Sequence, residues 1–379
     1  MGNHNGYSAI KGFVVLYKIG KMDFGGIYYQ GERRMKEYTS IELFAGAGGL
    51  ALGLEQAGFK HLGLIEKDKD AAATLKLNRP NWNVLCEDIM DVAERDLEAE
   101  FGIKRGELDL LSGGAPCQSF STVGKKLGLE DTRGTMFYYY AVFLHKLYPK
   151  VFLFENVKGL RTHDKKRTYK TILQVFEDAG YNTTNAVLNT WDYGAPQKRE
   201  RFFTVGIRKD LADISVFSFP TPHDYKPLIK DVKLDTSPSK EECSYYSENK
   251  RKIMEMVPPG GCWQDIPIDI AKKYMGAAWF LEPIGTGKTG ILRRFKLDEP
   301  CYTVMTSATG SYTERCHPIE IRPFSYRENA RFQTFPDEWE FTGSLSSKYK
   351  QVGNAVPVSV AKDLGFQIIS ALQVITNEG

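Results

Sequence analysis

Short apolar runs alternate with amphipathic stretches from Thr39 to about Arg208. Four of the apolar runs have the length of buried strands, and they cover residues 41–44, 61–65, 108–111 and 151–154. Helical patterns lie between and after them, at residues 50–56, 70–77, 136–147 and 169–179. Continuous apolar strands separated by helices predict an α/β fold with a mostly parallel, doubly wound sheet that is covered on both faces.

Each predicted strand ends in glycine or polar residues. The first run leads into glycines, the second ends at Glu66, the third leads into Gly113 and Gly114, and the fourth ends at Glu155 and Asn156. Ligands of parallel sheets gather at the carboxyl ends of the strands. We therefore expect the functional site at this edge of the sheet.

The alternation stops after Arg208. Residues 213–320 carry many prolines and glycines without a sustained period, and helical patterns return at residues 326–333 and 358–374. We predict an α/β domain at 39–212, a smaller irregular domain at 213–335 and a C-terminal segment at 336–379. Residues 1–38 lack clear periodicity. We interpret them as a dispensable N-terminal extension, for which disorder is one of the interpretations.

Composition narrows the class of protein. Of the 379 residues 42% are hydrophobic and 26% charged, which excludes wholesale disorder, and no apolar run approaches the roughly 18 residues of a membrane span. The six cysteines form no CxxC pair, so we expect no metal site and reduced thiols in a cytoplasmic protein. The net charge of +3 equals that of residues 1–38, so charge alone indicates no nucleic-acid partner.

Residues 44–49 (FAGAGG) carry the first motif. Glycines after a strand allow a tight turn and let a ligand approach the start of a helix. Glu66 stands twenty residues beyond Gly46 and suits a ribose diol. Taken alone, this motif does not separate a nicotinamide enzyme from one that uses S-adenosylmethionine, and a turn without a ligand also explains it.

Residues 113–121 (GGAPCQSFS) carry the second motif. Cys117, held by Pro116 after a buried strand and two glycines, is placed like a nucleophile. Burial as a structural cysteine is the alternative. An arginine-glycine pair at residues 133–134 is harder to explain by packing.

The ordered set of motifs resembles the DNA (cytosine-5) methyltransferase family, in its compact restriction-modification form. The set comprises FAGAGG, PCQSFS, ENVKG at 155–159, QKRER at 197–201, RENARFQTFP at 327–336 and QVGNAVP at 351–357. The resemblance covers nearly all of residues 39–379 except about 213–320. It implies that residues 213–335 recognise the target DNA and that the C-terminal segment returns to the catalytic domain.

The resemblance implies methyl transfer from S-adenosylmethionine to carbon 5 of a flipped-out cytosine, with S-adenosylhomocysteine as product. Cys117 would add to carbon 6 of the ring, and Glu155 would contact ring N3 and the exocyclic amine. Arg201 would hold the carbonyl oxygen, while Arg199 and Gln197 would organise the site. Glu155 can act as an acid near neutrality only if its pKa is raised.

Cofactor contacts follow from the same resemblance. Phe44 would lie against the adenine, Glu66 would hold the ribose, and Asp88 and Ile89 would meet the adenine edge. The other expected contacts are Gly46, Gly48, Gly49, Leu50, Pro116, Asn354 and Val356. Two positions depart from the family pattern: Glu42 stands where aspartate is usual, and Lys67 stands where an apolar or aromatic neighbour is frequent.

DNA contacts are expected on a loop after the nucleophile, on a basic cluster at residues 158–170 and in the irregular domain. The candidate residues are Gln118, Ser119, Ser121, Lys125, Arg133, Arg293 and Arg294. For each charge a solvated surface is the alternative. We expect a monomer that binds duplex DNA, without a membrane or metal partner. A restriction endonuclease would act on the same DNA sequence without binding this protein stably.

Three rival functions are weaker. A tRNA cytosine-5 methyltransferase of this fold carries a Cys-Phe-Thr segment that is absent from this sequence. A non-catalytic DNA-binding relative should have lost Cys117, Glu155 or Arg201. A nicotinamide enzyme has no use for PCQSFS. The sequence therefore predicts a DNA (cytosine-5) methyltransferase of a restriction-modification system.

Overall fold

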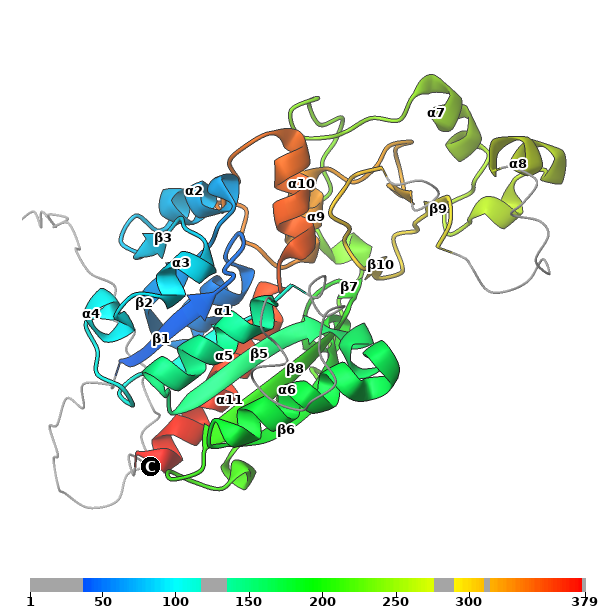
Figure 1. The fold of residues 1–379 in the computed structure, drawn as a ribbon. Helices are drawn as coiled ribbons and strands as arrows, with labels where there is room; N and C mark the ends of the chain where they lie inside the picture. Colours follow the sequence, from blue (N-terminus) through cyan, green and yellow to red (C-terminus); the bar gives the residue numbers. More distant parts are fainter. Residues whose placement is uncertain (1–36, 117–134, 276–289, 310–313, 377–379) are drawn as a thin grey trace, which may run out of the picture. The chain divides into compact units, whose positions relative to one another are not determined.

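The predicted apolar strands assemble into one seven-stranded sheet (Figure 1). The computed structural model describes residues 37–116, 135–275, 290–309 and 314–376. In order across the sheet, the strands are β3 (Val84–Leu85), β2 (Phe59–Ile65), β1 (Tyr38–Leu43), β4 (Leu110–Gly113), β5 (Val151–Val157), β8 (Glu200–Arg208) and β6 (Tyr181–Asn189). Neighbouring strands are parallel except for β8, which runs antiparallel to both β5 and β6. The predicted mostly parallel α/β fold is thus confirmed.

The strand register brings the four polar ends together. Leu43 pairs with Ile65 on one side and with Gly113 on the other, and Gly113 pairs with Phe154. Strands β1, β2 and β4 therefore end at the level of Phe154, whereas β5 continues to Val157 beside β8, beyond the end that the sequence predicted. The glycines and Glu66 that follow the first three strands gather with Glu155 of β5 along one edge.

Alternation along the strands assigns side chains to the two faces of the sheet. Phe152 and Phe154 join the core under α5 (Met136–Leu147) and α6 (Arg167–Asp178), to which α3 (Ile89–Ala93) and α4 (Leu97–Phe101) also contribute. Val151 and Leu153 join the opposite core under α1 (Gly49–Ala57) and α11 (Val358–Ile375). Figure 1 shows α5 and α6 on one side of the sheet and α11 on the other. Because both faces are covered, central strands such as β4 and the first part of β5 are buried on both sides.

Glycines let α1 and α11 pack at backbone distance. A Cβ atom on Gly53 would lie 2.4 Å from Ala361 Cβ and 2.5 Å from Val358 O. A Cβ atom on Gly365 would lie 2.5 Å from Ala57 Cβ. The C-terminal helix is therefore seated directly on the helix that follows the glycine loop.

One apolar stretch is longer than the sequence analysis allowed. Residues Leu345–Ile375 are long and apolar enough to cross a membrane by length and composition. The structure divides them into α10 (Leu345–Asn354) and α11 at residues 355–357. Leu364, Ile368 and Leu372 of α11 are fully buried against the sheet and α1, so this stretch is a core element of the described fold.

The remaining chain builds two further cores. One joins α2 (Lys69–Asn78) and the glycine loop to α9 (Tyr326–Phe332) and α10. The other lies within residues 246–321 and holds α7 (Glu248–Glu255) and α8 (Ile268–Met275). This region otherwise contains two-residue strands: β9 (Arg293–Arg294), β11 (Arg315–Cys316) and β10 (Cys301–Tyr302), which pairs with β7 (Gln197–Lys198). The domain boundaries at 212 and 335 stay a prediction.

Candidate active site

The loop between β1 and α1 adopts left-handed backbone conformations. The φ angles are 58° at Phe44, 55° at Gly46 and 88° at Gly48. The amide of Gly46 donates to Glu66 Oε2 at 2.7 Å. Within the described residues, no atom comes within 4 Å of the position that a Gly46 Cβ would occupy. The loop therefore turns tightly and leaves open space in front of Gly46.

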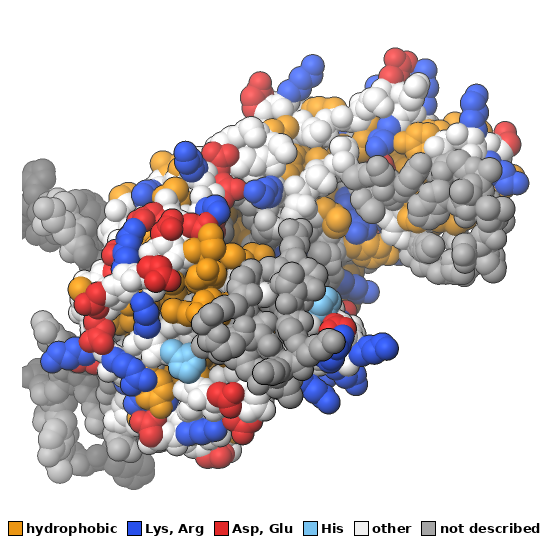
Figure 2. Space-filling view, in the orientation of Figure 1, with side chains coloured by type: hydrophobic (Ala, Val, Ile, Leu, Met, Phe, Trp, Pro, Cys, Tyr) orange, Lys and Arg blue, Asp and Glu red, His pale blue; other side chains and the backbone are white. Residues whose placement is uncertain are grey.

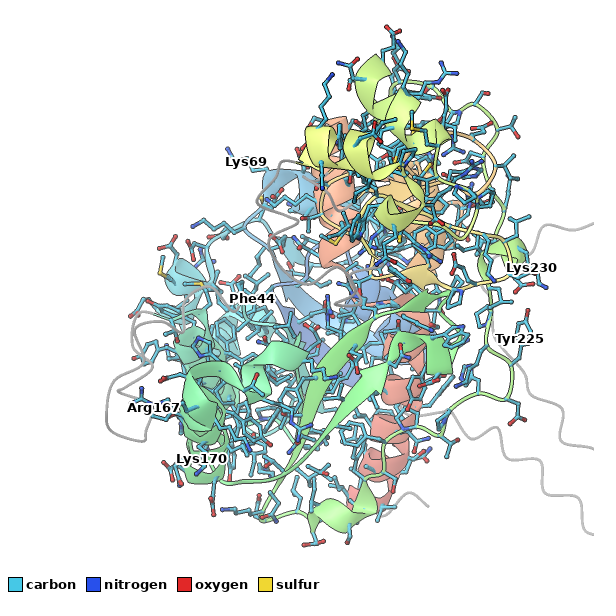
Figure 3. All side chains as sticks on the ribbon, turned by 90° about the vertical axis from the view of Figure 1, so that its right-hand side faces the viewer. Phe44, Lys69, Arg167, Lys170, Tyr225 and Lys230 are labelled. Atoms are coloured by element: carbon cyan, nitrogen blue, oxygen red, sulfur yellow. The ribbon has the colours of Figure 1, made fainter. Side chains whose placement is uncertain are left out.

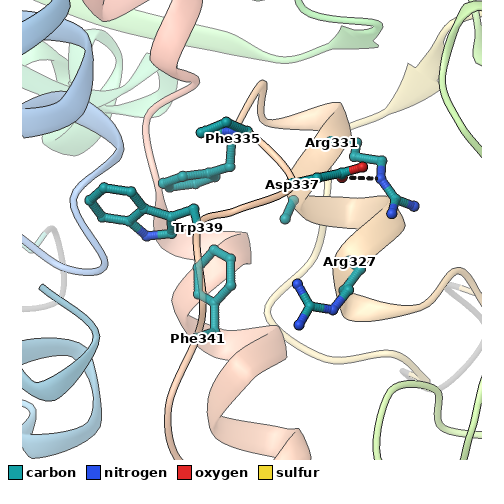
Figure 4. A pocket seen from close by; sticks show the side chains of 8 residues that line it. Arg327, Arg331, Phe335, Asp337, Trp339 and Phe341 are labelled. Atoms are coloured by element: carbon teal, nitrogen blue, oxygen red, sulfur yellow. Dashed lines mark hydrogen bonds and ion pairs between the residues drawn. The ribbon is translucent and has the colours of Figure 1, made fainter. Parts of the chain in front are cut away.

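Gly48 and Gly49, the next two glycines of the loop, are packed against other parts of the protein. A Cβ on Gly48 would lie 2.6 Å from Leu75 Cδ2 and 3.1 Å from Trp339 Cζ2, and one on Gly49 would lie 2.1 Å from Val356 O. Figure 4 shows the Trp339 ring grouped with Phe335 and Phe341. The C-terminal segment thus presses on the back of the glycine loop. Sequence analysis missed Trp339, whose only sequence signal is its place just after the motif at 327–336.

Glu66 is tied to two backbone amides. Its Oε2 accepts from Gly46 N and its Oε1 from Asp68 N, both at 2.7 Å. Burial raises the pKa of Glu66, and these two hydrogen bonds oppose the rise. The carboxyl group is therefore fixed in orientation beside the glycine loop, where sequence analysis expects a ribose.

The next strand end carries Asp88 and Ile89. Asp88 caps α3, accepting from Met90 N at 3.1 Å, and Ile89 is buried behind it. Lys67 forms an ion pair with Asp88 and lowers the pKa of that carboxyl group. The unusual lysine at position 67 thus serves as the partner of a predicted cofactor residue, which the sequence did not indicate.

An apolar surface borders these carboxylates. Phe44 is partly buried against the core under α5, and Met90 is 37% exposed. Figure 2 shows hydrophobic side chains gathered over the region of α3 and the start of α5. Figure 3 labels Phe44 beside the first strands of the sheet. An adenine-sized ring would find apolar contact here.

Glu42 is the buried acid of β1. It is 1% exposed, its Oε2 lies 3.5 Å from Ser112 Oγ, and its pKa is raised well above the usual value by burial. Leu50, which follows the glycines, is also buried. In the C-terminal segment, which lies against the glycine loop, Val356 is 8% exposed, whereas Asn354 is exposed.

Glu155 and Arg201 form an ion pair across β5 and β8. Arg201 Nε lies 3.1 Å from Glu155 Oε1, and the two side chains are 15% and 14% exposed. They come together because Glu155 pairs with Phe203 and Val157 with Arg201 in the antiparallel ladder. Burial raises the pKa of Glu155 even though Arg201 and Arg199 oppose the rise. The pKa of Glu155 is thus shifted in the direction that an acid role would need, and that role stays a prediction.

The segment that carries Cys117 begins beside this pair. A Cβ on Gly114 would lie 2.4 Å from Glu155 Oε2, so glycine is required for the carboxyl group to fit. Asn156 Nδ2 donates to Ala115 O at 2.9 Å and holds the chain one residue before the exposed Pro116. Cys117 itself lies outside the described residues, as do Gln118, Ser119, Ser121, Lys125 and Arg133.

Gln197 and Arg199 face away from the open edge into the protein. Gln197 donates to Phe332 O at 2.8 Å and accepts from Val304 N at 3.1 Å. Arg199 is 1% exposed and donates to Val304 O, Gly353 O and Ala355 O at 3.2, 2.8 and 3.0 Å. These two residues join the start of β8 to segments near residues 304, 333 and 354. Gln333 donates to Val352 O at 2.7 Å and to Ala355 O at 3.0 Å and completes this network; it belongs to the motif at 327–336, but the sequence analysis gave it no role.

The predicted DNA-contacting arginines of the irregular region are engaged internally. Arg293 donates to Gly260 O at 2.6 Å and forms an ion pair with Glu299. Arg294 donates to Val257 O and Pro318 O, both at 3.2 Å. This placement leaves little of either guanidinium group for DNA, and their role in DNA binding stays a prediction.

The basic cluster at 158–170 lies on the surface next to β5. Lys158, Arg161, Lys165, Lys166, Arg167 and Lys170 are all exposed. Lys158 pairs with Glu200 and Arg167 with Asp164, whereas the chain at 164–166 takes left-handed φ angles of 46°, 51° and 72°. Figure 3 shows Arg167 and Lys170 projecting outward. The cluster is accessible to a phosphate backbone.

The described residues contain no group of three or more His, Cys, Asp or Glu side chains that could hold a metal ion. The site at the strand ends therefore offers carboxylates, a glycine loop and an apolar wall within the described chain.

Known proteins are similar in sequence to most of this chain. Residues 38–370 match the family model described as C-5 cytosine-specific DNA methylase. The Type II methyltransferase M.Sau96I of Staphylococcus aureus is 51% identical over 342 residues, which cover 90% of this chain and 77% of that protein. The Type II methyltransferase M.Eco47II of Escherichia coli is 46% identical over 344 residues, covering 89% and 80%.

Solved structures are similar in fold at low sequence identity. The Schizosaccharomyces pombe Dnmt2 methyltransferase has a TM-score of 0.61 at 18% identity and covers 89% of this chain and 98% of its own. The Entamoeba histolytica methyltransferase EhMeth has a TM-score of 0.59 at 14% identity, covering 91% and 99%. These likenesses extend over the sheet and the C-terminal segment together.

Proposed function

Because the chain belongs to the family of C-5 cytosine-specific DNA methylases, we propose that it methylates one cytosine within a specific duplex DNA sequence, using S-adenosylmethionine and a covalent bond from Cys117. Its class as a DNA (cytosine-5) methyltransferase is the premise for this proposal. The observation that carries the proposal is the ion pair of Glu155 and Arg201 beside Gly114, at the start of the Cys117 segment.

The residues at the first two strand ends fit S-adenosylmethionine. Open space lies before Gly46, and the Glu66 carboxyl group, fixed by two amides, suits the two hydroxyls of a ribose. Phe44 offers apolar contact for an adenine and Asp88 a polar edge, whereas Ile89 and Val356 are buried and Asn354 is exposed, so these three stay contacts expected from the family resemblance. When bound, the cofactor supplies an electrophilic methyl group on a positively charged sulfur.

The cytosine would be activated by three side chains of this enzyme. The Cys117 thiolate adds to carbon 6, and the electron pair of the 5,6 double bond becomes available at carbon 5. Glu155 donates a proton or a hydrogen bond to ring N3, where the charge from this addition accumulates. After methylation, a water molecule takes the proton from carbon 5, the Cys117 thiolate leaves carbon 6 as the 5,6 double bond re-forms, and ring N3 returns its proton to Glu155.

Arg201 serves two purposes in this scheme. Its guanidinium group holds the cytosine carbonyl oxygen, and its contact with Glu155 keeps that carboxyl group in place. Burial keeps the Glu155 pKa raised despite this cation, so a protonated carboxyl group is accessible at lower cost than in water. Gln197 and Arg199 would position the strand without touching the base.

The biological role we propose is modification within a restriction-modification system. Curated relatives at 51%, 49% and 46% identity are named Type II methyltransferases, and each match covers 89–90% of this chain. The protein would act as a monomer on the DNA of its own cell, in the cytoplasm, and a cognate endonuclease would recognise the same sequence.

Bisulfite sequencing of a plasmid from cells that express the protein tests the proposal. We expect protected cytosines at one fixed position of a short recurring sequence, and none with Cys117→Ala. Bisulfite sequencing of tRNA from the same cells distinguishes the tRNA rival, for which we expect no signal. Absence of plasmid methylation, or equal methylation by Cys117→Ala, would contradict the mechanism.

A further inference from the structure

Helix α10 of the C-terminal segment is joined to α2 by two side-chain contacts. Lys350 Nζ lies 2.8 Å from Asp68 Oδ2, and Thr74 Oγ1 donates to Gln351 Oε1 at 2.7 Å. Asp68 comes directly before α2, in the turn after β2 that also carries Glu66. A cation from a distant part of the chain is therefore placed near the residue that we assign to the ribose.

Asp68 connects Lys350 with Glu66. Its Oδ1 atom caps α2, accepting from Asp70 N at 3.1 Å and from Ala71 N at 3.3 Å. Its Oδ2 atom accepts from Lys350, and its backbone amide donates to Glu66 Oε1 at 2.7 Å. Each polar group of this residue that faces the turn thus has a defined partner, and the turn is held between α2 and α10.

The carboxyl group of Glu66 is exposed to opposing electrostatic effects. Burial raises its pKa, and the negative charge of Asp68 raises it further. Glu42, the buried acid of β1, is also close enough to interact electrostatically with Glu66. The positive charge of Lys350 lowers the Glu66 pKa, as do the two backbone amides that donate to it. Lys350 therefore opposes burial and the neighbouring carboxyl groups.

The charge state of Glu66 matters for the contact with a ribose. The two ribose hydroxyls are donors, and an ionised carboxyl group is an acceptor at both of its oxygens, whereas a protonated one is a donor at one of them. Each oxygen of Glu66 already accepts from one amide, and the remaining lone pairs are available to the ribose. A group that keeps Glu66 ionised therefore favours this contact.

We propose that Lys350 is a positioning residue for the cofactor, which keeps the Glu66 carboxyl group ionised and oriented toward the ribose through its charge and its contact with Asp68; this rests on the proposed function. Lys67, the neighbour of Glu66 in the sequence, is instead engaged by Asp88. The side chains of Lys350 and Asp68 are 58% and 33% exposed, so the effect on affinity is modest and depends on pH.

Binding of S-adenosylhomocysteine to the protein alone, measured by titration calorimetry from about pH 8 to about pH 5, tests this role. Lys350→Met keeps the aliphatic part of the side chain and removes its charge. Without Lys350 the pKa of Glu66 should rise further, so the ionised form is lost at a higher pH than in the wild type. We expect the variant to bind less than about 2-fold more weakly near pH 8 and about 2- to 5-fold more weakly near pH 5. Comparing the two proteins at each pH cancels the titration of the ligand itself.

Two rescue variants separate the effect of charge from a loss of structure. Lys350→Arg keeps the positive charge and should bind like the wild type at each pH. Asp68→Asn, added to Lys350→Met, removes the carboxylate that opposes ionisation of Glu66 and keeps a good helix cap. The double variant should therefore recover most of the affinity that Lys350→Met loses near the lower pH.

Matched controls come from the same two helices. Thr74→Val breaks the neighbouring contact between α2 and α10 and leaves the buried Gln351 amide oxygen without this donor. It should lower the melting temperature without a loss of affinity that grows as the pH falls. Lys76→Met removes an exposed lysine of α2 and should change neither property. Lys350→Met should melt close to the wild type, because an exposed ion pair contributes little.

Three results would overturn the inference. An equal loss of affinity at every pH would assign Lys350 to the structure of the turn, and unchanged affinity of Lys350→Met at every pH would remove it from cofactor binding. A loss that persists in full in the double variant with Asp68→Asn would exclude the charge. Failure of the wild type to bind S-adenosylhomocysteine, or wild-type affinity in Glu66→Gln, would instead contradict the cofactor site of the proposed function, so the two failures are distinguishable.

Discussion

Two opposing effects act on the carboxyl group of Glu155, the residue that we propose as the acid of the reaction. Its carboxyl group lies 3.1 Å from a guanidinium nitrogen, which favours the charged form, yet burial outweighs that influence and raises the pKa. A glycine at position 114 makes room for it. The proposed role of this carboxyl group is to give a proton or a hydrogen bond to the cytosine ring, and the raised pKa favours its protonated form.

The substitution Glu155→Gln tests this role. Glutamine keeps the shape of the side chain and can still donate a hydrogen bond, but its amide cannot transfer a proton to ring N3, so we expect the methylation rate to fall by roughly 10²- to 10⁴-fold if proton transfer is the role of Glu155. The melting temperature should stay close to that of the wild type, since the amide can still contact Arg201. Single-turnover methylation of the cognate duplex measures the effect.

Glu200→Gln is the matched control for Glu155→Gln. Glu200 lies on the strand of Arg201, but it is half-exposed and pairs with Lys158 on the surface. Its loss should change the rate by less than a few fold, as surface ion pairs contribute little. A Glu155→Gln enzyme with the wild-type rate would remove Glu155 from the chemistry.

At the scale of elements, α9 begins with a reciprocal cap that also anchors a neighbouring loop. Ser325 Oγ accepts from Glu328 N at 3.0 Å, and Glu328 Oε2 accepts from Ser325 N at 2.7 Å. Glu328 is fully buried and binds Arg322 through both oxygens, at 2.7 and 3.0 Å. Asp235 N donates to the same carboxyl group at 2.9 Å. One carboxylate thus joins a helix start, an arginine and a distant loop.

The pH dependence of stability should report on this carboxylate. Burial alone would raise the pKa of Glu328, but His317 and Arg322 bring it down to about 2. A lowered folded-state pKa stabilises the protein above the unfolded value, and this contribution disappears as the pH falls toward 2. Glu328→Gln should therefore lower the free energy of unfolding by about 3–5 kcal/mol at pH 7.

The deficit of Glu328→Gln relative to the wild type should shrink as the pH falls below the ordinary glutamate value of 4.5. Urea unfolding at a series of pH values measures it. Glu248→Gln provides the comparison, because Glu248 is 80% exposed in an i,i+4 pair with Lys252. A constant deficit from pH 7 down to pH 3 would show that Glu328 stabilises the fold by packing rather than by charge.

At the scale of the molecule, Arg199 connects parts of the chain that are far apart in sequence. It lies between β7 and β8, two residues before Arg201, and it donates to Val304 O, Gly353 O and Ala355 O. It satisfies carbonyl groups of buried segments, one of which, Ala355 O, also accepts from Gln333 Nε2 at 3.0 Å. The same segment, residues 353–356, lies against Gly49 of the cofactor loop. Loss of Arg199 should therefore affect stability and cofactor binding together.

For Arg199→Met we expect a loss of about 2–5 kcal/mol in the free energy of unfolding, since it leaves buried carbonyls without donors. The KM for S-adenosylmethionine should rise more than the KM for DNA. Arg251→Gln, an exposed i,i+4 pair, should shift stability by less than about 0.5 kcal/mol. Unfolding by urea and steady-state kinetics measure both. A stable Arg199→Met variant with an unchanged KM would contradict this linkage.

Much of the fold and the site was accessible from the sequence. The apolar runs predicted β1, β2, β4 and β5, and the glycine or acidic residue after each run predicted where the site lies. Parallel strands that are covered on both faces read as apolar runs, so a local pattern is enough to find them. The carboxyl ends of parallel strands lie along one edge of the sheet, so the residues after each run indicate where a ligand would bind. Strands β6 and β8, with mixed patterns, were not singled out, although β8 carries Arg201.

The sequence by itself determined the order of the motifs, the α/β class and the placement of Glu66 and Glu155 near the carboxyl ends of strands. Tertiary structure decided which charged side chains are engaged by other parts of the chain: Lys67 by Asp88 at the surface, Arg293 by Glu299, and Arg199 by three carbonyl groups. These contacts join residues distant in the chain, and side-chain bonds to remote carbonyls leave no periodic trace in a sequence.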